Sequence, residues 1–117
     1  MYAIVRGDLA MTPGKAASQA GHAFLGAFLR NQDSALLSSY HQDFPQSPGT
    51  KVVLQAPDLT AIERAQEALN QCSLPYFLVV DSGCENLNDG HPTVTALGFG
   101  PIRKHEVPKA LRRLRLL

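Results

Sequence analysis

The sequence has 117 residues, of which 44% are hydrophobic and 18% are charged, and its formal net charge is +1. This length suits one domain, and the composition excludes a disordered chain. No apolar run approaches the roughly 18 residues of a membrane span, and the N-terminal residues lack the pattern of a secretory signal. Two cysteines are too few for a disulfide scaffold. We therefore expect a single cytoplasmic domain over residues 1–117 with no membrane association.

The chain alternates between segments typical of strands and segments typical of helices. Short β-prone runs predict strands at 2–6, 51–55, 76–81, 93–100 and, at an edge, 113–116. Helices are expected at 13–30 and 59–70, with shorter ones near 34–41 and 104–111. Thr12 and Asp58 are the expected N-caps of the two long helices, and the Gly-, Asn- and Asp-rich segment 82–92 predicts a loop.

This alternation predicts a compact three-layer α/β domain, in which helices flank a small β-sheet. Crossover helices between strands favour parallel pairing, so we expect the sheet to be mainly parallel. The strand at 93–100 follows the strand at 76–81 after only a loop, which favours antiparallel pairing there. The expected sheet is therefore mixed but mainly parallel.

The first helix carries a narrow polar stripe. At the helical period Lys15, Gln19 and His22 fall within about 60° of one another, opposite a face rich in alanine and phenylalanine. Lys15 lies in the first turn, where backbone N–H groups and the helix dipole favour anions, and Gly14 has no side chain to block a close approach. The stripe therefore fits either a pocket for a phosphate or an oxyanion, or a solvated helix face.

Asp81 is the second candidate, because it ends a strand just before a glycine-containing loop. Ligands of open α/β sheets gather at the carboxyl ends of strands. If the strands at 2–6 and 76–81 run in the same direction, Asp81 lies at the same end of the sheet as Lys15. Lys15 would then hold Asp81 ionised, and Asp81 would orient or deprotonate a water. The alternative is a carboxylate that only caps the loop.

Basic residues are concentrated near the C-terminus. Residues 1–100 hold five Lys or Arg against nine Asp or Glu, whereas residues 101–117 hold six against Glu106 alone. A local basic face can bind a phosphate backbone, because charges interact over about 10 Å at physiological salt. Lys51 would help if it faces outward. A solvated C-terminal face is the alternative, and composition alone favours it.

Several blocks of sequence share the pattern of one family. They are Ile4–Leu9 with Met11, the block GKAASQAGHA at 14–23, and the segments at 51–54, 56–58, 74–75, 81–83, 93–101 and 114–117. With these blocks the chain resembles the archaeal/eukaryotic-type, or type 2, peptidyl-tRNA hydrolases over nearly its whole length. The resemblance implies an α/β fold with a mixed sheet, a homodimer, and hydrolysis of the ester that joins a peptide to the 3′ end of tRNA. It implies no metal and no organic cofactor.

The resemblance also assigns residues. Lys15 and Asp81 match the family's catalytic lysine and aspartate. Thr95 is the threonine that we add to this pair, and we expect its hydroxyl to hydrogen-bond either the carboxylate or the ester. Substrate contacts are expected at Gly14, Gln19, His22, Glu85 and Thr93.

The loop after Asp81 departs from the family pattern. Glu85 stands where the family has a threonine, and the loop is about two residues longer. A carboxylate beside Asp81 would repel phosphate. The departure therefore keeps open the alternative of a catalytically inactive family member that binds RNA or a protein. A binder of small phosphate compounds is a third, separate alternative.

Overall fold

The computed structural model describes residues 1–83 and 88–117. Its strands are β1 (Tyr2–Arg6), β2 (Val52–Ala56), β3 (Tyr76–Asp81), β4 (Thr93–Phe99) and β5 (Arg115–Leu116). Its helices are α1 (Pro13–Arg30), α2 (Leu37–Tyr40), α3 (Leu59–Gln71) and α4 (Lys109–Arg112), with 3-10 turns at Asn88–Gly90 and Lys104–Glu106. Within these ranges the sequence predicted every strand and both long helices. The departures of 84–87 from the family pattern, Glu85 included, lie outside the described residues.

Both expected N-caps are present. The Thr12 side chain accepts a hydrogen bond from the backbone N–H of Lys15 at 3.3 Å, and the Asp58 carboxylate accepts one from Ala61 at 2.8 Å. Each cap satisfies an N–H group of a first helical turn that has no partner inside its helix. The cap of α1 therefore also fixes the position of Lys15, the residue on which the site depends.

The five strands of the described chain form one sheet in the order β3-β4-β1-β2-β5. Only β1 and β2 pair in parallel, while the other three pairs are antiparallel. The prediction of a mainly parallel sheet was therefore wrong. The reason is that β4 turns back after β3 and inserts between β3 and β1, and β5 turns back onto β2. The antiparallel pairing of β3 with β4 is confirmed.

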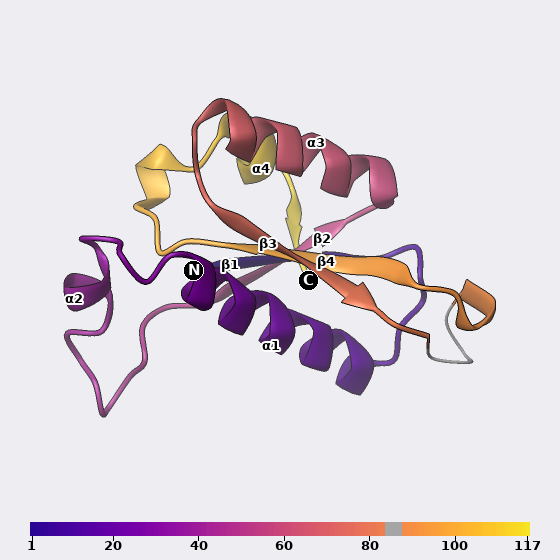
Figure 1. Cartoon of the computed structure of the whole chain (residues 1–117), viewed down its shortest axis with the longest axis horizontal. Coiled ribbons are helices and arrows are strands. Elements are labelled where there is room, and N and C mark those ends of the chain that lie inside the picture. Colours follow the sequence, from indigo (N-terminus) through magenta and orange to yellow (C-terminus); the bar gives the residue numbers. More distant parts are fainter. Residues whose placement is uncertain (84–87) are drawn as a thin grey trace.

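The insertion of β4 still leaves β1, β2 and β3 pointing the same way, because β4 is antiparallel to both β1 and β3. Their carboxyl ends lie at one end of the sheet, and α1 and α3 begin at that end (Figure 1). The condition that would bring Lys15 and Asp81 to the same end of the sheet is thus met.

Helices cover both faces of the sheet, α1 on one side and α3 with α4 on the other (Figure 1). The α3 face holds the larger core, which includes Ile4, Ile62, Leu69, Leu97 and Phe99. The buried hydrophobic residues of the α1 face are small, namely Ala3, Val5, Ala20, Ala23, Val79 and Ala96. Helix α1 lies so close to β4 that a Cβ on Gly98 would fall 1.9 Å from the carbonyl oxygen of Ala23.

No helix in residues 1–83 or 88–117 is both long and apolar enough to span a membrane.

Candidate active site

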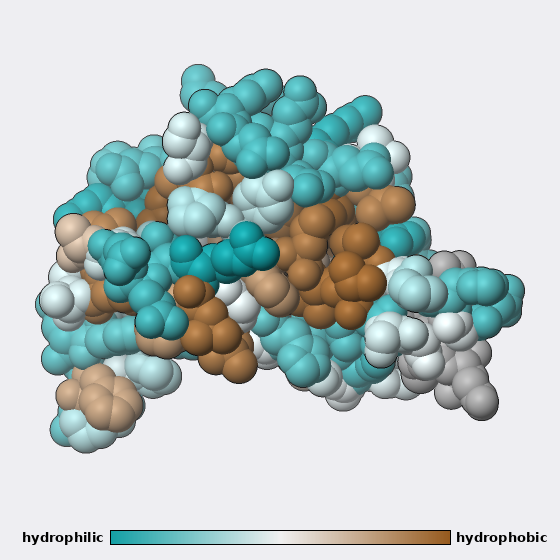
Figure 2. Space-filling model, viewed as in Figure 1, coloured by the Kyte–Doolittle hydropathy of each residue, from teal (hydrophilic) through white to brown (hydrophobic). Residues whose placement is uncertain are grey.

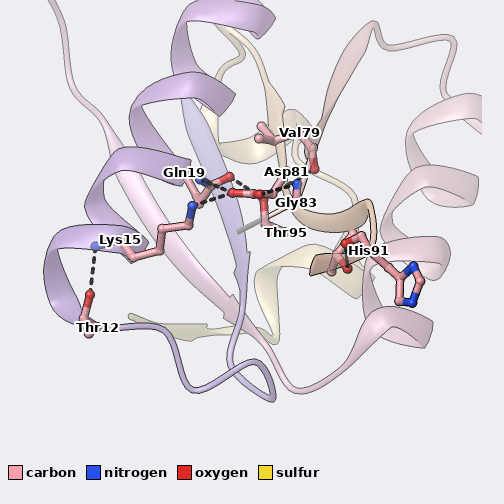
Figure 3. A network of polar contacts seen from close by, with 9 residues as sticks. Thr12, Lys15, Gln19, Val79, Asp81, Gly83, His91 and Thr95 are labelled. Carbon is pink, nitrogen blue, oxygen red and sulfur yellow. Dashed lines mark hydrogen bonds and ion pairs between the residues drawn. The ribbon is translucent and has the colours of Figure 1, made fainter. Parts of the chain in front are cut away.

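Lys15 and Asp81 meet at the end of the sheet where α1 begins and β3 ends. The Lys15 ammonium donates a hydrogen bond to Asp81 Oδ2, and the two groups form an ion pair (Figure 3). The side chains are 30% and 12% exposed, so the pair is partly shielded but reachable from solvent. The structure therefore confirms that Lys15, on the first turn of α1, lies next to Asp81, at the end of β3.

The Asp81 carboxylate is held by further donors. Its Oδ1 accepts a hydrogen bond from the backbone N–H of Gly83 at 3.1 Å, and its Oδ2 faces the Gln19 amide nitrogen at 3.5 Å. The Gly83 contact is the loop-capping role that the sequence left open for Asp81, and it occurs together with the Lys15 pair. The carboxylate thus has a fixed orientation relative to α1.

Gln19 connects Asp81 to Thr95. The Thr95 hydroxyl lies 2.5 Å from Gln19 Oε1 and 3.4 Å from the carbonyl oxygen of Val79, so its single proton goes to Gln19. This contact orients the amide, because its oxygen faces the hydroxyl and its NH₂ group faces the carboxylate (Figure 3). Gln19 is 3% exposed and Thr95 is fully buried. The chain Thr95–Gln19–Asp81 is therefore an internal network, with only its last member near solvent.

A bulge in the sheet places Thr95 in this network. The register between β3 and β4 shifts between Val79, which faces Ala96, and Val80, which faces Val94. Thr95 is the extra residue on β4, and both it and Ala96 point toward α1. A bulge breaks the strict alternation of side chains. Without it, two consecutive residues would not share the α1 face.

The other expected contact residues lie at different distances from the carboxylate. Thr93 pairs directly opposite Asp81, is 6% exposed, and donates from its hydroxyl to the carbonyl oxygen of His91 at 3.1 Å. Gly14 is exposed, and a Cβ built on it would meet no atom within 4 Å. His22 is exposed one turn after Gln19. The polar stripe of α1 is thus only partly solvated, because Gln19 is buried against the sheet.

A groove of about 530 Å³ leads away from Asp81 between α1 and β3. Gln19, Asp81 and Ser82 line one end, and Arg30 and Phe77 line the other. Sequence reasoning missed this groove, although two signals were present. Phe77 and Val79 precede Asp81 at a spacing of two, so they share its face of β3. Leu25 and Leu29 follow the polar stripe of α1 at helical spacing.

No three His, Cys, Asp or Glu side chains come together as a possible metal site in the described ranges. The described side chains at this end of the sheet offer an ammonium, an oriented carboxylate and polar groups. Such a set suits attack by water on a carbonyl group, with a cation beside the developing negative charge.

Comparison with known proteins agrees with this chemistry. The family described as "Peptidyl-tRNA hydrolase PTH2" matches residues 1–117. The chain belongs to the PTH2 family. Among similar proteins, the peptidyl-tRNA hydrolase of Methanopyrus kandleri is 40% identical over 97% of this chain and 94% of its own length. The peptidyl-tRNA hydrolase of Pyrobaculum aerophilum is 33% identical over 86% of this chain and 84% of its own length. That of Methanothermobacter thermautotrophicus is 31% identical over 97% of this chain and 96% of its own length.

Membership of the PTH2 family makes this chain a peptidyl-tRNA hydrolase. The prediction that this chain is a peptidyl-tRNA hydrolase, made from the resemblance, is confirmed by its family. In this PTH2 chain the lysine of the GKAASQAGHA block and the aspartate that ends β3 are the two groups that form the ion pair.

The basic residues of the C-terminal segment do not form one face. Arg113 and Arg115 are exposed beside the carboxyl end of β2, at the same end of the sheet as Lys15. Arg103 follows β4 and lies at the opposite end. Arg112 donates to the backbone carbonyls of Val107 and His105, which is a structural role.

Two further cations have partners within the chain. The Arg6 guanidinium binds Asp8 and the carbonyl oxygen of Val94, and its hydrogen bonds to Asp8 hold the pKa of that carboxyl below its usual value. The Lys51 ammonium donates to the carbonyl oxygens of Pro48 and Gly49 at the amino end of β2, and burial lowers its pKa. Lys51 therefore lies at the wrong end of the sheet to help bind a phosphate near Lys15.

Proposed function

We propose that Lys15 and Asp81 are the groups that hydrolyse the ester between peptide and tRNA. The observation that supports this most is their direct ion pair, shielded but reachable, at the end of the sheet where α1 begins. Asp81 orients the attacking water and accepts its proton as the water oxygen bonds to the ester carbonyl carbon. Collapse of the tetrahedral intermediate breaks the bond to the 3′ oxygen, which takes up the proton held by Asp81 and leaves as the hydroxyl of free tRNA.

Lys15 has two tasks in this scheme. Before substrate binds, its ammonium keeps the carboxylate ionised. When the ester occupies the site, the same ammonium lies beside the carbonyl oxygen and stabilises the negative charge that develops there. The capped first turn of α1 fixes the backbone of Lys15, so little reorganisation is needed during the reaction.

Thr95 acts as a positioning residue in this proposal. It is fully buried and donates to Gln19, whose amide faces Asp81. The expectation that Thr95 bonds the carboxylate or the ester directly is thus replaced by contact through Gln19. The substrate contacts expected of Gly14, His22 and Thr93 stay predictions, and the open space beside Gly14 supports the first of them.

The tRNA approaches over the end of the sheet where the carboxyl ends of β1 and β2 lie. Arg113 and Arg115 are exposed there and are suited to bind backbone phosphates. Replacing both with Ala is expected to raise KM. The slope of log KM against log salt concentration should also fall, by the amount that corresponds to about two lost phosphate contacts. Replacing Arg103 and Lys104, at the opposite end, is the matched control and leaves both unchanged.

A discharge assay tests the central proposal. The wild-type chain is expected to release labelled peptide from peptidyl-tRNA, and Lys15→Ala to slow this release by a factor of about 100 or more. A gel shift of the same RNA runs in parallel. Bound RNA with an intact ester in the wild-type reaction would identify an inactive binding module. Inhibition by mononucleotides alone, with no dependence on tRNA, would identify a binder of small phosphate compounds.

The homodimer and the cytoplasmic location expected from the sequence stay predictions. Sedimentation equilibrium of the full chain measures the first, and fractionation of the source cells measures the second.

A further inference from the structure

The groove between α1 and β3 is continuous with the Lys15–Asp81 site. Gln19 and Asp81 belong to both, and from them the groove follows α1 to Arg30 while it follows β3 back to Phe77. From Gln19 to Arg30 the helix rises about 16 Å, which is the length of about five residues of an extended chain. An elongated ligand attached to the reacting carbonyl can therefore lie in this groove.

The groove is lined mainly by apolar side chains. Leu25, Leu29 and Val80 are 58%, 57% and 54% exposed, which is high for large hydrophobic residues. Between α1 and β3 the Phe77 ring packs against Gly26, where a Cβ would fall 2.1 Å from the ring. Figure 2 shows hydrophobic surface over β3 and beside the C-terminal end of α1. Arg30 lies over the Phe77 ring at 5.9 Å and is the cationic residue of this lining.

The two halves of the substrate differ in the surface that they need. A tRNA 3′ strand carries a negative charge at each phosphate and would gain little from Leu25, Leu29 and Val80. A peptide gains from burying apolar side chains on such a surface. The exposed arginines 113 and 115 lie toward the β5 edge of the sheet, while the groove lies at the β3 edge. The ester at Asp81 lies between them.

We propose that this groove binds the peptide half of peptidyl-tRNA, an inference that rests on the proposed function. The residue esterified to tRNA lies at Asp81, and the preceding residues extend along β3 toward Phe77. β3 is one of the two edge strands of the described sheet, so an extended peptide can pair with its outer edge while its side chains contact Leu25 and Val80. The groove therefore favours apolar residues just before the esterified one.

The test uses two substrates that share one tRNA and one esterified residue, and whose two preceding residues are Leu-Leu or Asp-Asp behind an N-acetyl group. We expect the wild-type kcat/KM to be about tenfold higher for Leu-Leu, mainly through KM, because the apolar side chains are buried on binding. Equal values for the two substrates would overturn the proposal. Because both carry the same tRNA, effects on tRNA binding cancel in their ratio.

A charge swap sharpens the test. Leu25→Lys places a cation in the groove and is expected to move the ratio at least tenfold toward Asp-Asp, a gain that a folding defect does not produce. Leu116→Lys, at a 73% exposed position on the opposite edge strand, is the matched control and leaves the ratio unchanged. Equal ratios in the two variants would overturn the proposal.

The remaining outcomes are also decisive. If Leu25→Lys alters the sedimentation behaviour of the chain and leaves the ratio unchanged, a second copy of the chain covers the groove and the inference fails. In that case hydrolysis that still depends on Lys15 shows that the proposed function stands. If the wild-type chain cleaves neither substrate, the proposed function fails, and the inference fails with it.

Discussion

The α1 and α3 faces of the sheet are both covered by helices, but they are built from different side chains. The α3 face buries large residues such as Ile62, Leu69 and Phe99. The α1 face packs alanines and valines against the helix, and it also carries Gln19 and Thr95, two of the buried polar residues. Small residues allow a close approach between helix and sheet, and this approach lets Gln19 reach both Thr95 and Asp81.

This difference separates stability from chemistry. Burial of large apolar side chains is the main favourable term in folding, so the α3 face contributes most of it. On the α1 face, part of the buried surface is polar and is organised around one carboxylate. Substitutions on the α3 face should therefore lower stability with little effect on turnover, whereas those in the α1 network should lower turnover more strongly than stability.

Asp81→Asn should give the largest effect. The variant keeps the shape of the side chain but cannot accept a proton from water, so kcat is expected to fall by a factor of about 100 to 10,000. The Asp81 side chain is only 12% exposed, so loss of its charge should also lower the free energy of unfolding, by about 1–3 kcal/mol. Single-turnover hydrolysis and urea unfolding measure the two quantities. Wild-type turnover would remove Asp81 from the mechanism.

Leu69→Ala examines the opposite face. Leu69 is fully buried, so its truncation should lower the free energy of unfolding by about 3 kcal/mol, measured by urea titration. Turnover at a temperature where the variant is folded should stay within about twofold of wild type, because Leu69 does not contact the site. Leu116→Ala, at a 73% exposed position, is the control and should change stability by less than about 0.5 kcal/mol. A large loss of turnover in folded Leu69→Ala would mean that the two faces are not separable.

Thr95→Val tests the buried relay. Without the hydroxyl, Gln19 Oε1 loses its hydrogen bond and the amide is no longer held toward Asp81. We expect kcat to fall about tenfold and stability to fall by about 1–2 kcal/mol, since a buried acceptor is left unpaired. Thr95→Ser keeps the hydroxyl and should recover most of kcat. If Ser and Val behave alike in kcat, packing rather than the hydrogen bond is what matters at this position.

Gly14→Ala should give the smallest effect. A Cβ at Gly14 meets no atom of the chain within 4 Å, so the substitution should stabilise the helix by a few tenths of a kcal/mol, up to about 1 kcal/mol. If the ester approaches this turn, kcat/KM nevertheless falls a few-fold. Gly21→Ala, which also meets no atom within 4 Å, is the control and should stabilise α1 without changing kcat/KM. Equal activity of both variants would show that substrate does not contact Gly14.

Much of the local structure could be predicted from the residues. Strand and helix periods, the caps Thr12 and Asp58, and the place of Lys15 in the first turn of α1 depend on neighbours a few positions apart, and all agree with the structure. The approach of Lys15 to Asp81 could also be predicted, because it required only that β1 and β3 run in the same direction.

Long-range pairing decided the rest. The order of the strands depends on which neighbour each strand selects across the sheet, so local pattern did not reveal that β4 separates β1 from β3. Alternation along β4 does not predict that Thr95 and Ala96 share one face, since a bulge requires a partner strand. The burial of Gln19 likewise depends on how closely α1 approaches the sheet, and Gly98 and the alanines of α1 set that distance. The sequence by itself therefore determined which groups are available, and the tertiary structure determined which of them face the carboxylate.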